Sequence, residues 1–73
     1  MITFVLSSDE KNNKFANWNT SVDVIYQGEV PRRGDKLSLC FGEKAEHFEV
    51  TNVTWTFDAQ KGIQGVVIEL ERE

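Results

Sequence analysis

The side chains that could carry out chemistry in this 73-residue chain are few and scattered. There is one histidine, His47, and one cysteine, Cys40. A zinc site needs three or four converging ligands, and a reactive cysteine needs a nearby cation or helix N-terminus. His47 stands beside Glu46 and Glu49, so we expect a solvated surface group, and Cys40 is expected to fill space on a strand. These residues predict no catalytic site and no metal site.

The known catalytic and cofactor motifs are also missing from the sequence. No serine lies in a G-x-S-x-G elbow, and the five glycines form neither a G-x-G-x-x-G nor a Walker pattern. We therefore expect a protein that is not an enzyme and holds no cofactor.

The basic residues Arg32, Arg33 and Lys36 form the one basic cluster of the chain, in the turn V-P-R-R-G-D-K. Exposed charge at a turn is usually only solvated. The alternatives are a docking point for an acidic protein surface or a phosphate contact. Arg-Gly-Asp is also the tripeptide of extracellular adhesion ligands, but here Gly34 and Asp35 are expected to build the turn itself. A formal net charge of −4 disfavours nucleic acid as a partner, because it repels phosphates at long range.

Aromatic and aliphatic residues offer a second kind of binding surface. Phe15 and Trp18 stand three apart in a loop over residues 8–20, where they either plug an open end of the fold or form an aromatic platform. Ile25 and Val67 are predicted at outward positions, as is Val5. They either form an apolar patch for self-association or a partner, or pack on the second face of the fold.

Period-two alternation of apolar residues indicates that these side chains are carried by β-strands. Val, Ile, Thr, Phe, Trp and Tyr suit pleated strands and are plentiful here. The alternation predicts five strands, over residues 2–7, 21–27, 36–41, 47–58 and 63–71.

The fourth predicted strand changes parity midway. Its inward apolar residues are even-numbered up to Val50 and odd-numbered from Val53 to Phe57. One extra residue near Thr51 and Asn52, a β-bulge, restores both sets to one face and bends the strand.

The turns between the strands follow from glycine, proline and charge. Pro31 and Gly34 predict a tight corner before the third strand. Residues 43–46 are expected to form a short charged turn, residues 59–62 a hairpin connection, and Gly65 a bulge or tight crossing.

These elements predict an all-β fold of one domain over residues 1–73, a small five-stranded antiparallel SH3-like barrel. An OB-like barrel is the alternative, although G-E-K-A-E is too short for the helix that such barrels usually carry. Pro31, Gly34, Asp35 and Leu37, followed by F-E-V-T-N-V-T-W and V-V-I-E-L, resemble a layout seen in small bacterial and phage proteins of unknown function with SH3-like barrels. The resemblance implies a fold and brings no catalytic residue with it.

The N-terminal residues lack a basic region, and their apolar run is shorter than a signal or membrane segment. Together with the single cysteine, these features predict a cytoplasmic protein that does not bind a membrane. We expect a protein-binding or assembly module whose partner is another protein or itself, as a homo-oligomer. One alternative is a nucleic-acid-binding barrel that uses Arg32, Arg33, Lys36, Phe15 and Trp18. The other is a phage or mobile-element accessory protein, an inhibitor whose acidic surface occupies a host protein's nucleic-acid site.

Overall fold

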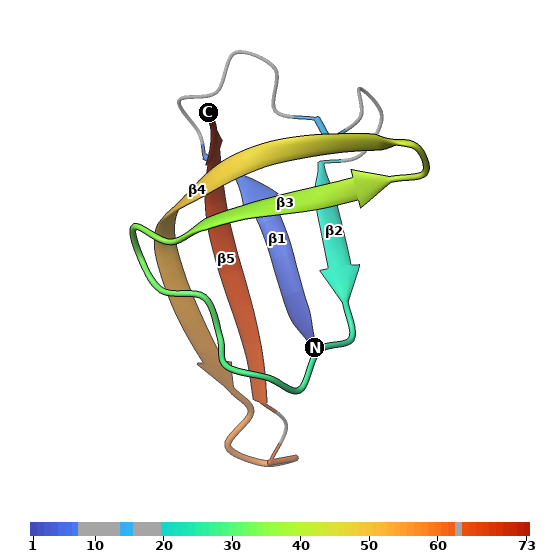
Figure 1. Cartoon of the computed structure of the whole chain (residues 1–73). Coiled ribbons are helices and arrows are strands. Elements are labelled where there is room, and N and C mark those ends of the chain that lie inside the picture. Colours follow the sequence, from blue (N-terminus) through green and yellow to red (C-terminus); the bar gives the residue numbers. More distant parts are fainter. Residues whose placement is uncertain (8–13, 16–19, 63) are drawn as a thin grey trace.

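Five strands form one curled sheet in the computed structural model, which describes residues 1–7, 14–15, 20–62 and 64–73 (Figure 1). The strands are β1 (Ile2–Leu6), β2 (Ser21–Val24), β3 (Lys36–Phe41), β4 (Lys44–Phe57) and β5 (Gln64–Arg72). Their order across the sheet is β2-β1-β5-β4-β3. The predicted all-β class and the number of strands are confirmed.

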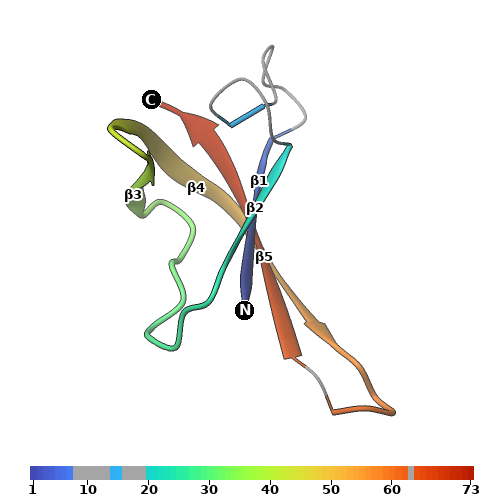
Figure 2. The same cartoon turned by 90° about the vertical axis from the view of Figure 1, so that its right-hand side faces the viewer.

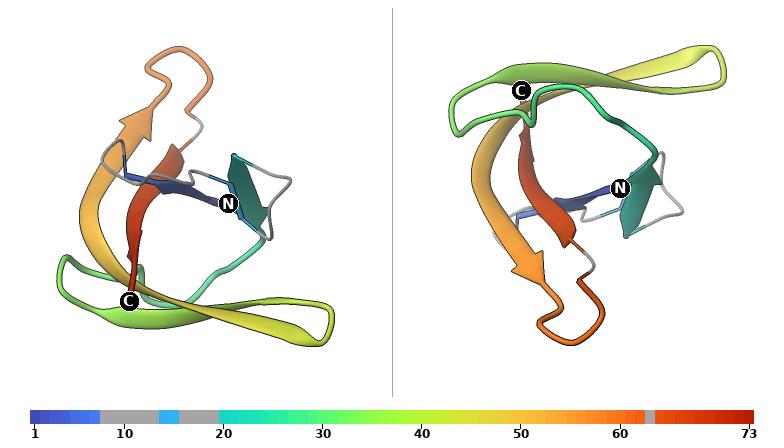
Figure 3. Two further views of the ribbon diagram at one scale, coloured as in Figure 1. Left: turned by 90° about the horizontal axis from the view of Figure 1, so that it is seen from above. Right: turned by 90° about the horizontal axis from the view of Figure 1, so that it is seen from below.

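The sheet is mixed, and this corrects the predicted antiparallel arrangement. β1 pairs in parallel with β5, from Ile2 opposite Val66 to Leu6 opposite Leu70, whereas the other neighbouring strands pair antiparallel. Alternation identifies a strand and its two faces, but it does not say in which direction the neighbouring strand runs. The sheet curls into a half-barrel with β2 and β3 at its two edges, as the views along its axis show (Figure 3). The finer expectation of an SH3-like barrel is therefore not confirmed.

The predicted bulge in β4 is confirmed. Val50 pairs with Leu70 and Asn52 with Glu69, which leaves Thr51 as the extra residue. The Thr51 hydroxyl donates a hydrogen bond to the Glu69 carbonyl at 3.2 Å. The strand bends at this point, so that β3 and the first half of β4 cross over β1 and β5 (Figure 1).

The core lies on the concave face of the curled sheet. Its buried apolar residues are Ile2, Phe4, Leu6, Phe15, Phe48, Val50, Val66, Ile68 and Leu70. Phe15 has no exposed surface and packs edge-on against Phe48, with ring centroids 5.5 Å apart. Arg72 holds the segment Lys14–Phe15 in place by donating a hydrogen bond to the Lys14 carbonyl. Phe15 thus plugs the fold, the platform interpretation is wrong for it, and Trp18 lies outside the described residues.

Several predicted boundaries differ from the structure. β2 ends at Val24, so the predicted strand over residues 21–27 is too long. Only Gly42 and Glu43 connect β3 to β4, which begins at Lys44. The predicted charged turn over residues 43–46 is therefore wrong. The favoured two-residue hairpin loops contain positive φ angles, which glycine adopts without strain, and Gly42 has a φ of 69°.

The predicted bulge or tight crossing at Gly65 is also wrong, since nothing lies within 4 Å of a Cβ placed there. Gly65 pairs with Thr56 in a regular antiparallel register, and β5 begins at Gln64. The hairpin over residues 59–62 is confirmed. Asp58 holds it by accepting hydrogen bonds from the backbone N–H groups of Gln60 and Lys61 at 2.9 and 2.8 Å.

Gly42→Ala is expected to lower the free energy of unfolding by about 1 kcal/mol, because an L-residue is strained at positive φ. Nothing lies within 4 Å of a Cβ placed at Gly42, so the cost would be backbone strain alone. Gly65→Ala is the matched control, since its Cβ also meets nothing within 4 Å and its φ is not positive. Urea unfolding of both variants measures the difference, and equal midpoints would contradict the expectation.

Candidate functional site

Large apolar side chains that remain exposed gather at one end of the half-barrel. In the described part of the chain, the exposed large hydrophobic residues are Met1, Ile25, Tyr26, Trp55 and Phe57. Met1 precedes β1, Ile25 and Tyr26 follow the end of β2, and Trp55 and Phe57 end β4, all at the lower end in Figure 1. We call these five residues the apolar end.

The inner face of β4 runs from the core into the apolar end. Val50 is 1% exposed, Val53 is half-buried, and Trp55 and Phe57 are 46% and 68% exposed. The cause is the length of the neighbouring strands. β3 pairs with β4 only as far as Glu49, whereas β4 and β5 continue as a hairpin that extends past the other strands (Figure 2). The Trp55 and Phe57 rings stack on each other, with centroids 6.4 Å apart and planes 11° apart.

The loop that follows β2 brings Tyr26 to the same end. The Tyr26 ring lies directly over Gly28, where a Cβ atom would overlap the phenolic hydroxyl. A pocket of about 290 Å³ joins Tyr26 to Met1, Val30 and Trp55. Segments far apart in the sequence therefore meet at the apolar end.

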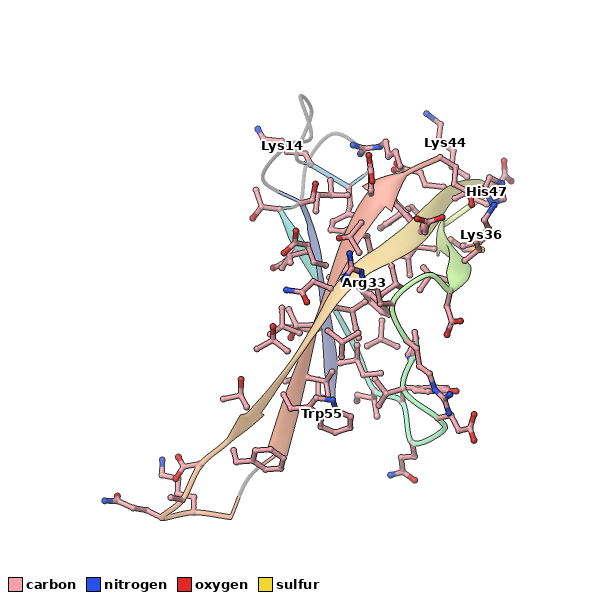
Figure 4. The ribbon with its side chains drawn as sticks, turned by 90° about the vertical axis from the view of Figure 1, so that its left-hand side faces the viewer. Lys14, Arg33, Lys36, Lys44, His47 and Trp55 are labelled. Atoms are coloured by element: carbon pink, nitrogen blue, oxygen red, sulfur yellow. The ribbon has the colours of Figure 1, made fainter. Side chains whose placement is uncertain are left out.

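A larger pocket adjoins the apolar end and is bordered by two arginines. It has a volume of about 610 Å³ and is lined by residues 28–33 of the loop and by Asn52, Val53 and Trp55 of β4. We call it the arginine pocket. Figure 4 shows Arg33 beside β4, above Trp55. The volume lies within the range of about 300–1,000 Å³ that ligand sites usually have.

The turn that carries the two arginines is built as predicted. The Asp35 carboxylate accepts a hydrogen bond from the Arg32 backbone N–H at 2.8 Å, and Gly34 has a φ of 92°. The Gly34 N–H donates to the Val50 carbonyl at 2.8 Å, which fixes the turn against β4. Gly34 and Asp35 thus have structural roles, and Arg32 and Arg33 are exposed.

The remaining predicted binding residues do not join this site. Lys36 lies on β3, and its ammonium group is 3.4 Å from the Glu73 carboxylate, so the predicted basic cluster is divided. Val5 and Val67 are half-buried on the convex face of the sheet, whereas Ile25 is 88% exposed at the apolar end. The three outward residues therefore form no single patch.

The concave side also has an apolar groove of about 210 Å³ between the two edges of the half-barrel. It is lined by Ile2, Phe4, Val24, Tyr26, Pro31, Leu37, Ser38 and Leu39. The inner side chains of β3 are only half-buried along this groove, because β3 is an edge strand of the described sheet. Tyr26 connects the groove to the apolar end.

The residues first considered for chemistry stand apart from the apolar end. His47 Nδ1 shares a hydrogen bond of 2.7 Å with the Ser38 hydroxyl, and both residues are exposed. Cys40 is an exposed free thiol on β3, so the expectation that it fills space on the strand is wrong. In residues 1–7, 14–15, 20–62 and 64–73, no three His, Cys, Asp or Glu side chains are placed to hold a metal ion.

Sequence reasoning missed the functional potential of Tyr26, Trp55 and Phe57, because their alternation assigns them to the core. One signal could have found Trp55 and Phe57. The fourth strand is the longest predicted strand, so its far end extends beyond the shorter strands that would cover it. Tyr26 offers no such signal.

Comparison of the chain with protein-family models, with curated proteins and with solved structures gave no match. Within the part of the chain that the structure describes, no helix has the length and hydropathy that a membrane crossing needs.

Proposed function

We propose that this protein is a non-enzymatic binding module whose apolar end docks on another protein. The observation that carries the proposal is the gathering of exposed large apolar residues at one end, where Met1, Tyr26 and Trp55 line one pocket and the Trp55 ring stacks on Phe57. Monomeric soluble proteins rarely expose large contiguous apolar patches, and such patches mark interaction sites. Aromatic side chains in particular supply much of the binding energy at protein interfaces.

The predicted relation to small SH3-like barrel proteins of bacteria and phages belongs to the same proposal. The curled five-stranded sheet and its bulged fourth strand support it, whereas the parallel pair β1–β5 argues against it. We also propose a cytoplasmic location, which the single cysteine supports.

The test is a selection of random dodecapeptides displayed on phage, with the full chain immobilised. Peptides enriched on the chain are expected to bind the variant Trp55→Ser/Phe57→Ser about 30-fold more weakly or worse, because truncation of even one hot-spot aromatic at an interface costs about 2 kcal/mol. Fluorescence anisotropy of the synthetic peptides measures the change. Val5→Thr/Val67→Thr removes two apolar side chains from the convex face and should change the affinity less than about threefold.

Two results would reject the proposal. In the first, no peptide is enriched. In the second, the enriched peptides bind Trp55→Ser/Phe57→Ser as tightly as the wild type while circular dichroism shows that the variant is folded.

The stacked pair Trp55 and Phe57 supports a second candidate, binding of single-stranded nucleic acid. Bases stack on aromatic side chains beside cationic groups, and Arg32 and Arg33 border the same region. The net charge of −4 weakens this candidate. Titration with fluorescent oligothymidylate at low salt tests it, since electrostatic affinity is greatest there.

A further inference from the structure

The arginine pocket combines an apolar wall with a cationic border. Its wall is formed by Val30, Pro31, Val53 and the Trp55 ring. Its charged lining residues are Arg32, Arg33 and one carboxylate, Glu29. No carboxylate of the described residues forms a salt bridge with either arginine. Two exposed arginines therefore line the same pocket as the exposed Trp55, on a chain of net charge −4.

This charge pattern selects the chemistry of the occupant. Guanidinium groups bind carboxylates and phosphates through paired N–H donors, and such charge-assisted bonds are stronger than neutral ones. A long polyanion would meet the repulsion of the whole acidic chain, whereas a short acidic segment would contact only the pocket. Charge complementarity therefore favours a protein segment with local carboxylates over a nucleic acid.

A second copy of the chain fits this surface poorly. A two-fold dimer through this pocket would bring four arginines, two from each copy, into one interface, where Glu29 supplies only one lining carboxylate from each copy. Like charges brought together across an interface disfavour binding. The favoured occupant is thus a different protein.

We propose that the arginine pocket binds a segment of a partner protein that places one apolar side chain against Trp55 and carboxylates on Arg32 and Arg33. This inference rests on the proposed function and adds the chemical class of the partner. The apolar side chain would enter between the loop over residues 28–33 and β4, while Asp or Glu residues next to it would pair with the two guanidinium groups.

The experiment uses the dodecapeptides selected on the wild-type chain. They are expected to be enriched in Asp or Glu within a few residues of an aromatic or large aliphatic residue. Arg32→Ser/Arg33→Ser should weaken the binding of a synthetic selected peptide by about tenfold or more, since hydrogen bonds to charged groups are worth about 1.5–3 kcal/mol. Lys44→Ser/Lys61→Ser removes the same charge outside the pocket and should cost less than about threefold.

Charge reversal provides the second arm. Arg32→Glu/Arg33→Glu should abolish binding of the acidic peptide and recover binding of the same peptide with Lys in place of its acidic residues. Recovery requires a folded variant and a direct charge contact, so a merely structural effect of the substitutions would not produce it.

Each contrary outcome has a separate meaning. Peptides whose affinity depends on Trp55 and Phe57 but not on the arginines would overturn this inference and leave the proposed function standing. A library that yields no enriched peptide would overturn both. Tighter binding of oligothymidylate than of any selected peptide would overturn this inference and make a nucleic acid the occupant of the pocket. Light scattering could instead show a concentration-dependent dimer that the variant Trp55→Ser/Phe57→Ser does not form. This result would overturn the inference and make a second copy of the chain the occupant.

Discussion

Replacing Phe48 by alanine is expected to remove most of the stability of the protein, so that unfolded molecules become readily detectable at room temperature. Phe48 has no exposed surface and packs edge-on against Phe15. The Arg72 guanidinium carbon lies 5.9 Å from the centre of the Phe48 ring. Truncation of a buried phenylalanine costs about 3–5 kcal/mol, and a core of this size rarely supplies more than about 5 kcal/mol. The substitution therefore removes most of the free energy of unfolding.

Phe57→Ala is the matched control, because it removes the same side chain from a position that is 68% exposed. Its free energy of unfolding should stay within about 0.5 kcal/mol of the wild type. Urea titration followed by circular dichroism measures both variants. Comparable losses in the two variants would mean that Phe57 is buried like Phe48 and does not belong to the apolar end.

Cysteine pairs placed across β1 and β5 are expected to form disulfides only in the parallel register. Thr3 lies opposite Val67, and Val5 lies opposite Glu69, all half-buried on the convex face. In a Cys40→Ser background, Thr3→Cys/Val67→Cys and Val5→Cys/Glu69→Cys should therefore oxidise almost completely. Directly opposite residues have Cα atoms about 5 Å apart, within the range that a disulfide spans.

The crossed pairs are the matched controls. Thr3→Cys/Glu69→Cys and Val5→Cys/Val67→Cys place the thiols two residues out of register, with Cα atoms about 8 Å apart, which is too far for a disulfide. An antiparallel pairing of the two strands would reverse the result. Mass spectrometry after alkylation of free thiols counts the crosslinked fraction, and preferential oxidation of the crossed pairs would restore the predicted antiparallel arrangement.

The candidate site was only partly predictable. The basic turn was identified because Pro31, Gly34 and Asp35 specify a corner, and the observed hydrogen bond between Asp35 and the Arg32 backbone has the expected form. The aromatic residues were assigned to the core because Trp55 and Phe57 continue the inward register of β4. Alternation reports the face on which a side chain lies, but burial also requires another element over that face.

The amino-acid sequence on its own determined the strands, their inward faces, the bulge at Thr51 and the corner at Gly34. Each follows from side-chain alternation or from backbone conformations that few residues accept. The tertiary structure alone decided that β1 runs parallel to β5, that Phe15 enters the core and that the end of β4 stays exposed. These features depend on which distant segments cover one another, and no local pattern records that.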